Sequence, residues 1–358
     1  MIQEAAAGAP FCAMIKGAAY GHDPALVVRA LEGTGIAFWG AATINEAVEL
    51  RDMKVREPII VMRPLTLHEP ERVIRDQVKL MRHLGIRPTL ANDEAFRLID
   101  RTASNKSRPL YAHIKADTGM SRNGCLPYEI SAVLHKAGTI RGLVIEGIYS
   151  HFSCADNKSL ECARRQLASF NSILAGIKSA GINLPIRHMA NSGAIFRLPQ
   201  ARFDMVRPGR SIYGYGNRFL KGSENLIPVM RIEAPLVLTK WIKKGCACGY
   251  GCTYRTRRDT RIGLLPLGYA DGYSRRLSNA GVVDFKGKLA PVIGRISMDL
   301  TIVDLTGIPE AETGSPVCVL SNLRQAPHSM ESMARQLDTL PHEIGCNFGK
   351  RVQRVLSR

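Results

Sequence analysis

Short apolar runs alternate with longer amphipathic stretches from residue 11 to residue 207. The apolar runs predict β-strands at Phe11–Lys16, Ile36–Ala42, Pro58–Arg63, Ile86–Leu90, Tyr111–Asp117, Leu143–His151, Ile186–Asn191 and Phe203–Arg207. Apolar positions at helical spacing predict helices between most of them, as at Pro24–Leu31, Ile44–Met53, Asp93–Asp100, Tyr128–Lys136 and Ser159–Lys178. Eight strands separated in this way predict a parallel (β/α)8 TIM-like barrel. Little chain precedes the first strand, and we expect no helix there.

The pattern changes near Gly214. The runs that follow are typical of β-strands bounded by Gly, Pro, Asn and Asp, and they lie at Ala234–Trp241, Arg261–Leu267, Ala290–Val303 and Pro316–Leu320. These runs predict a C-terminal all-β domain. The sequence therefore predicts an α/β barrel at residues 1–218 and a β-domain at residues 219–358.

Polar groups follow the predicted barrel strands, at the face where such a barrel carries its chemistry. Lys16 ends the first strand and is followed by Gly17 and other small residues. A lysine in this place is either a solvated side chain or a Schiff-base nucleophile. Later strand ends carry His113–Gly124, Ser150–Phe152, His188–Ser192 and Asp204–Gly214. Each polar group alone suits an ordinary structural role, but together they predict an active site at one barrel mouth.

Tyrosines beside glycines recur in the predicted β-domain, at Gly249–Tyr254 and Gly268–Tyr273, and a further glycine motif lies at Gly294–Asp299. Such motifs suit hairpin turns with packed aromatic rings. A tyrosine hydroxyl also transfers protons, so these motifs are candidates for chemistry.

Composition narrows the function classes. The net charge is +18, but the basic residues are dispersed without a basic and aromatic ladder, so we expect no nucleic-acid partner. The charge instead favours an anionic cofactor and substrate. No run approaches the roughly 18 apolar residues of a membrane helix, and no export leader is evident, so we expect a cytoplasmic protein without membrane contact. The cysteines, 9 in all, lack framework or zinc-ligand spacing, so we expect reduced thiols and no metal.

The stretch Lys16-Gly17-Ala18-Ala19-Tyr20-Gly21-His22-Asp23 resembles the lysine motif of alanine racemases, Lys-Ala-x-Ala-Tyr-Gly-His-Gly. Gly17 and Asp23 depart from that motif. The other strand-end and β-domain motifs are similar to the same family in order and spacing, from about Lys16 to Arg354. The resemblance implies a fold-type III enzyme that uses pyridoxal 5'-phosphate to racemise an amino acid.

The resemblance also implies the two groups that exchange the substrate proton. Lys16 would bind the cofactor covalently and act as one acid/base group. Tyr250, reaching in from the partner subunit of a homodimer, would be the other. Two bases on opposite faces of a flat cofactor satisfy the geometry of racemisation.

Further roles follow from the same resemblance. Arg207 matches the arginine that faces the pyridine nitrogen. His151 matches the histidine that orients the tyrosine base, and His188 belongs to the same hydrogen-bond chain. Arg122 and the backbone at Met298 match the groups that bind the substrate carboxylate.

The remaining matches concern the entrance, a modified lysine and the phosphate. Tyr269 is expected to narrow the entry channel, and Lys115 matches a position that is carbamylated in many alanine racemases. The phosphate site is expected to comprise Tyr20, Ser192, Gly209 and Arg210. Arg210 stands where an aliphatic residue is usual, although its backbone still suits an anion.

The sequence is compatible with more than one substrate. A cytoplasmic alanine racemase that supplies D-alanine for peptidoglycan is the leading interpretation, and Lys115 with Asp117–Gly119 matches the alanine enzymes. Met120–Gly124 and Gly272–Arg275 also resemble broad-specificity racemases, which act on serine or basic amino acids. A non-enzymatic pyridoxal-phosphate carrier is the third alternative, and it would leave the β-domain without a role.

Overall fold

The structure, a computed structural model, describes residues 1–65, 70–102, 108–184, 186–216 and 219–356. The chain forms two compact units. One unit comprises residues 1–19, 24–212 and 216–226, and we call it the barrel unit. The other comprises residues 20–23, 213–215 and 227–358, and we call it the β unit. No helix among the described residues is long and apolar enough to cross a membrane.

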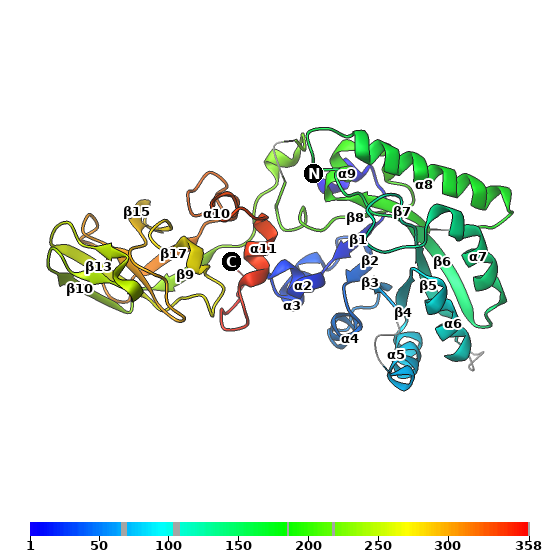
Figure 1. The fold of residues 1–358 in the computed structure, drawn as a ribbon, viewed down its shortest axis with the longest axis horizontal. Coiled ribbons are helices and arrows are strands. Elements are labelled where there is room, and N and C mark those ends of the chain that lie inside the picture. The colour runs from blue at the N-terminus through cyan, green and yellow to red at the C-terminus, as the bar shows by residue number, and fades with distance from the viewer. Residues whose placement is uncertain (66–69, 103–107, 185, 217–218, 357–358) are drawn as a thin grey trace. The chain divides into compact units, whose positions relative to one another are not determined.

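Eight parallel strands close the barrel, in the order of the sequence (Figure 1). They are β1 (Phe11–Met14), β2 (Ile36–Ala41), β3 (Ile59–Pro64), β4 (Ile86–Leu90), β5 (Leu110–Lys115), β6 (Leu143–Tyr149), β7 (Ile186–Asn191) and β8 (Met205–Arg207). Closure results from β1, which pairs with β2 on one side and with β8 on the other. The predicted barrel is therefore confirmed, with strand ends shifted by up to a few residues.

Helices connect the barrel strands. They are α3 (Pro24–Leu31), α4 (Ile44–Asp52), α5 (Glu71–Leu84), α6 (Asp93–Thr102), α7 (Ile130–Thr139), α8 (Glu161–Ser179) and α9 (Ser192–Arg197). In α5 the buried side chains Ile74, Val78 and Met81 recur at helical spacing, which gives the helix one face for the barrel. The expectation of no helix before β1 was wrong. Residues Ile2–Ala6 form the short helix α1, which is stabilised by burial of Ala6.

The β unit contains antiparallel sheets, as predicted for the C-terminal domain. One sheet has the order β10 (Leu238–Ile242), β13 (Thr260–Leu265), β16 (Thr301–Asp304). Another has the order β15 (Lys288–Pro291), β14 (Val282–Phe285), β17 (Pro316–Leu320), β9 (Ile232–Pro235). The strands β11 (Ala247–Cys248) and β12 (Tyr254–Arg255) form a small hairpin.

The β unit differs from the prediction in several details. The run Ala234–Trp241 spans parts of β9 and β10, and the run Ala290–Val303 spans parts of β15 and β16, because the chain passes from one sheet to the other within each run. The helices α10 (Met330–Leu337) and α11 (Pro341–Asn347) follow the last strand. The N-cap of α10 is Ser329, whose hydroxyl accepts a hydrogen bond from a backbone N–H of the first turn.

Candidate active site

Lys16 lies two residues beyond the end of β1. The backbone N–H of Met14 donates to Pro208 O at 3.1 Å, and that of Ile15 donates to Gly40 O at 2.9 Å. Each residue from Gly17 to Tyr20 then has a positive φ, between 51° and 65°. A left-handed residue with a side chain costs about 1–2 kcal/mol, so this turn is held by its surroundings.

Glu46 on α4 supplies part of that support. Its carboxylate accepts a hydrogen bond from the Gly17 N–H at 2.8 Å, and its other oxygen accepts from Ala42 N–H at 2.6 Å. Glu46 also completes the capping box of α4 with Thr43. One carboxylate therefore joins the end of β2, the start of α4 and the turn that carries Lys16.

Cationic side chains gather near Lys16 within the barrel unit. Burial lowers the pKa of Lys115 to about 8, with further contributions from the charges of Arg122, Arg207 and Lys16. The Lys115 ammonium donates a hydrogen bond to Asn123 Oδ1. A buried ammonium with this pKa has a substantial neutral fraction at mildly alkaline pH, which makes it a nucleophile.

His151 belongs to the same electrostatic group. Burial lowers its pKa well below the ordinary value, and the charges of Arg207, Arg122, Lys115 and Lys16 lower it further. The imidazole is therefore neutral at physiological pH. Four cationic side chains therefore lie near enough to act on His151, and such a group of cations favours an anionic ligand.

Arg207, at the end of β8, is held by several hydrogen bonds. It is 3% exposed. Its guanidinium donates to Ser150 O at 2.7 Å, to Met189 O at 3.3 Å and to His151 Nδ1 at 3.2 Å. A guanidinium held by several acceptors keeps one orientation, so Arg207 presents a fixed array of donors.

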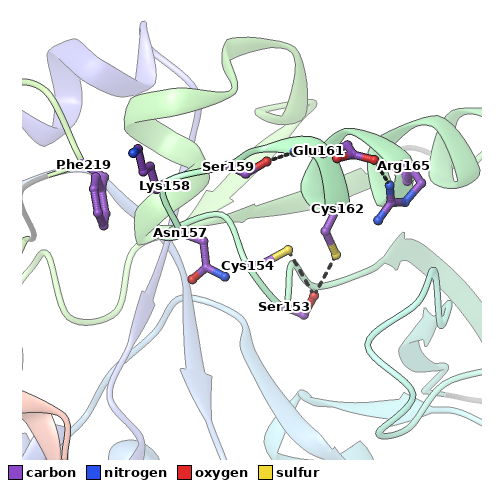
Figure 2. A pocket seen from close by; sticks show the side chains of 9 residues that line it. All are labelled: Ser153, Cys154, Asn157, Lys158, Ser159, Glu161, Cys162, Arg165 and Phe219. Carbon is purple, nitrogen blue, oxygen red and sulfur yellow. Dashed lines mark hydrogen bonds and ion pairs between the residues drawn. The ribbon is translucent and has the colours of Figure 1, made fainter.

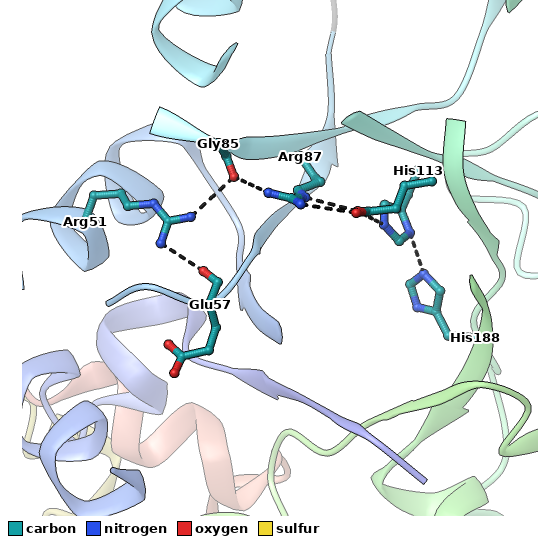
Figure 3. Close-up of polar contacts among 7 residues, drawn as sticks. Arg51, Glu57, Gly85, Arg87, His113 and His188 are labelled. Atoms are coloured by element: carbon teal, nitrogen blue, oxygen red, sulfur yellow. Dashed lines mark hydrogen bonds and ion pairs between the residues drawn. The ribbon is translucent and has the colours of Figure 1, made fainter. Parts of the chain in front are cut away.

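A relay of side chains continues from Arg207 through the barrel interior. Arg207 Nη1 lies 2.8 Å from His188 Nδ1, and His188 Nε2 lies 2.9 Å from His113 Nδ1. His113 Nε2 lies 3.2 Å from Glu146 Oε2, and Glu146 forms a two-pronged ion pair with Arg87 at 3.0 and 3.1 Å. Figure 3 shows His188, His113 and Arg87 in this arrangement. We call these five residues the relay.

The proton positions in the relay follow from its two ends. Arginine can only donate, so His188 Nδ1 accepts and its Nε2 carries the proton. His113 Nδ1 must then accept from His188, and His113 Nε2–H donates to the Glu146 carboxylate. Burial lowers the pKa of both histidines, which keeps them neutral and in this one tautomer. His188 Nδ1 is therefore a fixed hydrogen-bond acceptor for Arg207.

Tyr149, at the end of β6, was not singled out from the sequence. Its ring stacks on His188 with centroids 4.8 Å apart, and the Arg207 guanidinium lies 5.1 Å from the ring centroid. Its hydroxyl lies 2.9 Å from Thr89 Oγ1, and burial raises its pKa to about 12. Tyr149 supports the relay as a neutral, buried ring. Its position at a predicted strand end was the available signal.

Glu146 and Arg87 were also missed. Both lie inside strands, Glu146 in β6 and Arg87 in β4, rather than at the strand ends. A charged residue within an otherwise apolar strand was the signal that could have identified them.

Donors suited to an anion lie where β7 and β8 end. Ser192 Oγ accepts hydrogen bonds from Gly209 N–H at 2.9 Å, Ser211 N–H at 3.3 Å and Ser211 Oγ at 3.1 Å. The Ser192 hydroxyl still has its own proton to donate, and a donor held in this way suits a phosphate oxygen. The residues present therefore fit a phosphate group.

The charged side chain of Arg210 is not available to a phosphate. Its guanidinium forms an ion pair with Asp156 at 2.8 Å. This leaves the backbone of Arg210, rather than its side chain, for a phosphate.

The remaining predicted site residues lie in the β unit. Tyr250 begins the single turn η4 (Tyr250–Cys252) and is 70% exposed. The loops that carry Tyr269 and Met298 are joined by a hydrogen bond from Ala270 N–H to Met298 O at 3.0 Å. Tyr20 stacks on Tyr213, with ring centroids 4.9 Å apart. Tyr250, Tyr269 and Met298 are thus presented at the surface of this unit.

The turn that presents Tyr250 is constrained by two glycines. Gly249 and Gly251 have φ values of 69° and 72°. A side chain on Gly249 would meet the backbone N of Arg295 at 2.9 Å. The close approach and the left-handed backbone both require glycine at this position.

The buried relay leads to a first prediction, on stability. Burial raises the pKa of Glu146, but hydrogen bonds from His113 and Arg87 outweigh burial and lower it to about 2. A carboxylate with a lowered pKa stabilises the fold above its unfolded-state pKa of roughly 4.3, and this stabilisation disappears as the pH falls towards 2. We expect Glu146→Gln to reduce the free energy of unfolding at pH 7 by about 3 kcal/mol.

Urea titrations of Glu146→Gln at several pH values measure this effect. The exposed pair Lys79–Asp76, 3.4 Å apart, provides the control, and Asp76→Asn is expected to cost less than about 1 kcal/mol. Nitrogen-15 spectra of the histidines report the tautomers directly. An equal loss of unfolding free energy in Glu146→Gln and Asp76→Asn would contradict the relay. A proton on His188 Nδ1 would also contradict it.

Comparison with known proteins identifies the family. The family model for the alanine racemase N-terminal domain matches residues 1–217, and that for the alanine racemase C-terminal domain matches residues 229–356. Alanine racemase 2 of Caldanaerobacter subterraneus subsp. tengcongensis is 32% identical over 344 residues, covering 96% of this chain and 87% of the relative. Alanine racemase 1 of Clostridium acetobutylicum is 34% identical over 345 residues, with the same coverage of 96% and 87%.

Solved structures agree. The alanine racemase of Clostridium difficile 630 matches with a TM-score of 0.90 and 28% identity, covering 99% of this chain and 90% of that one. The alanine racemase of Bartonella henselae, solved with covalently bound pyridoxal phosphate, matches with a TM-score of 0.84 and 29% identity, covering 99% and 94%. The barrel, the C-terminal sheets and these matches agree with the resemblance seen in the sequence, and the chain belongs to the pyridoxal-phosphate-dependent alanine racemase family.

Proposed function

We propose that this protein interconverts L-alanine and D-alanine in the cytoplasm and supplies D-alanine for peptidoglycan. The observation that carries the proposal is the group of cations at the barrel mouth, where Lys16, Lys115, Arg122 and Arg207 all act on the pKa of His151. Such a mouth suits a substrate carboxylate together with an anionic cofactor. The names of the relatives, all alanine racemases, support alanine as the substrate.

We propose that Lys16 holds pyridoxal 5'-phosphate covalently and that residues 1–218 form the cofactor-binding domain. When bound, this cofactor delocalises the negative charge that develops at the substrate Cα. Ser192 and the backbone at Gly209 and Arg210 would bind the phosphate, together with Tyr20. The hydrogen bonds that Ser192 Oγ accepts hold its hydroxyl in place with its own proton available, which supports its part in this assignment.

Arg207 would face the pyridine nitrogen of the cofactor. A guanidinium keeps its proton, so it can donate a hydrogen bond to that nitrogen without protonating it. Its contacts with His188, His151 and the backbone support one orientation of the guanidinium. The relay would maintain this orientation, because it fixes the His188 tautomer in which Nδ1 can only accept a hydrogen bond.

Two acid/base groups would move the Cα proton. Lys16 Nζ would act on one face of the substrate, and Tyr250 Oη of the partner subunit would act on the other. His151, held neutral by burial, would orient that hydroxyl. In this proposal the protein is a homodimer, and residues 219–358 contribute the tyrosine to the partner's site. The 70% exposure of Tyr250 supports a position beside another surface.

The substrate carboxylate would be bound by Arg122 and by the backbone at Met298. Tyr269 would narrow the entrance, which favours a small side chain such as the methyl group of alanine.

A racemisation assay on a panel of L-amino acids tests the proposal. The protein, supplied with pyridoxal phosphate, is incubated separately with alanine, serine, lysine and arginine, and both enantiomers are quantified. We expect the highest kcat/KM for alanine. A higher value for serine or a basic amino acid would favour the broad-specificity alternative, and no racemisation of any substrate would contradict an enzymatic role.

We also propose that Lys115 is carbamylated. A carbamate forms when a neutral amine attacks carbon dioxide and releases a proton, and a pKa of about 8 makes that amine available. The anion formed could position Arg122 through a charge-assisted hydrogen bond.

Carbon-13 NMR of the protein in labelled bicarbonate checks this prediction. We expect one carbamate signal, absent from Lys115→Ala and lost on acidification. Lys79→Ala, a change at a lysine with 62% side-chain exposure, serves as the control and should retain the signal. A spectrum of the parent protein without a carbamate signal would contradict the proposal.

A further inference from the structure

A pocket of the barrel unit is lined by residues to which the proposed reaction assigns no role. It has a volume of about 720 Å³ and is lined by the loop between β6 and α8, by the start of α8 and by Phe219 (Figure 2). Two cysteines, Cys154 and Cys162, are among its lining residues, and both are partly exposed.

The two thiols meet at one hydroxyl group. Ser153 Oγ lies 3.5 Å from Cys154 Sγ and 3.5 Å from Cys162 Sγ, as the dashed lines in Figure 2 indicate. Two sulfur atoms that contact the same hydroxyl lie near each other, and such proximity is what disulfide formation needs first.

The two cysteines differ in reactivity. Interaction with Cys154 lowers the pKa of Cys162, and the charge of Arg165 lowers it further. Cys162 also lies in the first turn of α8, where the helix dipole favours an anion. Burial raises the pKa of Cys154, as does its interaction with Cys162. Cys162 is therefore the better nucleophile, and Cys154 is suited to attack it in a second step.

Hydrogen bonds connect the Ser153 hydroxyl to the segment that carries His151. Ser153 N–H and Ser153 Oγ both donate to Gln166 Oε1, at 3.0 and 3.1 Å. The amide nitrogen of Gln166 donates to the backbone oxygen of His151 at 3.0 Å. Gln166 is 2% exposed and lies one turn beyond Cys162 on α8. A change at the thiols would therefore act on the segment that carries His151.

We propose that Cys154 and Cys162 form a redox modification site that hydrogen peroxide oxidises to a disulfide. The Cys162 thiolate attacks one peroxide oxygen, the O–O bond breaks, and the second oxygen leaves as water after gaining a proton. Cys162 is then a sulfenic acid. The Cys154 sulfur attacks the Cys162 sulfur, the S–S bond forms, and the S–O bond breaks with loss of a second water. Two thiols and one peroxide thus give one disulfide and two waters, and a dithiol reductant reverses the change.

Mass spectrometry of the full-length protein tests the proposal without reference to racemase activity. Reduced protein is treated with equimolar hydrogen peroxide, alkylated and digested without reductant. We expect a cross-linked peptide that joins Cys154 to Cys162, with a mass loss of two hydrogen atoms. Cys246 and Cys252 are exposed cysteines of the β unit and serve as the internal control. We expect them to remain alkylated.

Single substitutions assign the order of the steps. In Cys154→Ser, we expect Cys162 to stop at the sulfenic acid, which dimedone traps. In Cys162→Ser, we expect Cys154 to remain a thiol at the same peroxide concentration. No cross-link in the parent protein, equal oxidation of Cys246 and Cys252, or dimedone labelling of Cys154 before Cys162 would each overturn the proposal.

Discussion

Lys16→Ala is expected to lower the rate of alanine racemisation by at least about 10⁴-fold, because two functions are lost with one side chain. A positioned acid/base group alone contributes roughly 10²–10⁴-fold, and Lys16 is also the proposed covalent attachment point of the cofactor. The turn from Gly17 to Tyr20 holds the lysine at the end of β1 by its backbone, so the substitution should leave the fold intact. Racemisation kinetics and circular dichroism of the variant measure the two effects.

A chemical test locates the attachment independently of activity. Borohydride treatment of the parent protein should fix the cofactor on the peptide that contains Lys16, and Lys16→Ala should remain unlabelled. Lys79→Ala, which changes a solvent-exposed lysine on α5, should behave like the parent protein in both tests. Cofactor fixed to a peptide without Lys16 would refute the assignment.

Tyr250→Phe is expected to affect the two enantiomers unequally. The change removes the proton-transferring hydroxyl and keeps the ring, while Lys16 still acts on the other face of the substrate. We expect exchange of the Cα proton with solvent deuterium to fall by about 10²–10⁴-fold for one enantiomer and much less for the other. Nuclear magnetic resonance of D-alanine and L-alanine in deuterium oxide measures both rates.

A matched control exists in the barrel unit. Tyr128 is 79% exposed and has no assigned role, so Tyr128→Phe should leave both exchange rates unchanged. An equal fall for both enantiomers in Tyr250→Phe would argue against a two-base mechanism.

Mixing the two inactive variants tests whether the site is shared between subunits. Under conditions of subunit exchange, Lys16→Ala and Tyr250→Phe chains should form heterodimers in which one site has both intact groups. Activity should then return to a fraction of the parent value. Demonstrated exchange without recovery would show that Lys16 and Tyr250 do not act across an interface.

The amino-acid sequence by itself determined the element order and the family. Hydrophobic periodicity is a local property, and it located the barrel strands, including β4 and β7, whose predicted ends match the structure. It was less informative where burial depends on the rest of the fold. The N-terminal helix α1 and the C-terminal helices α10 and α11 were missed for this reason.

Only the tertiary structure decided how the polar groups are connected. The relay joins side chains from β4, β5, β6, β7 and β8, and no local pattern specifies that Arg87, Glu146 and Arg207 are linked through two histidines. The direction of its hydrogen bonds depends on a donor-only arginine that is packed at one end.

The same distinction holds at the edges of the site. The sequence left the charge of Arg210 unassigned, and the structure pairs it with Asp156. The sequence also gave Cys154 and Cys162 no special status, yet the loop and the first turn of α8 bring both thiols to Ser153. Periodicity and motif spacing determine which elements form, whereas side-chain contacts between elements depend on packing and are decided only when the whole barrel closes.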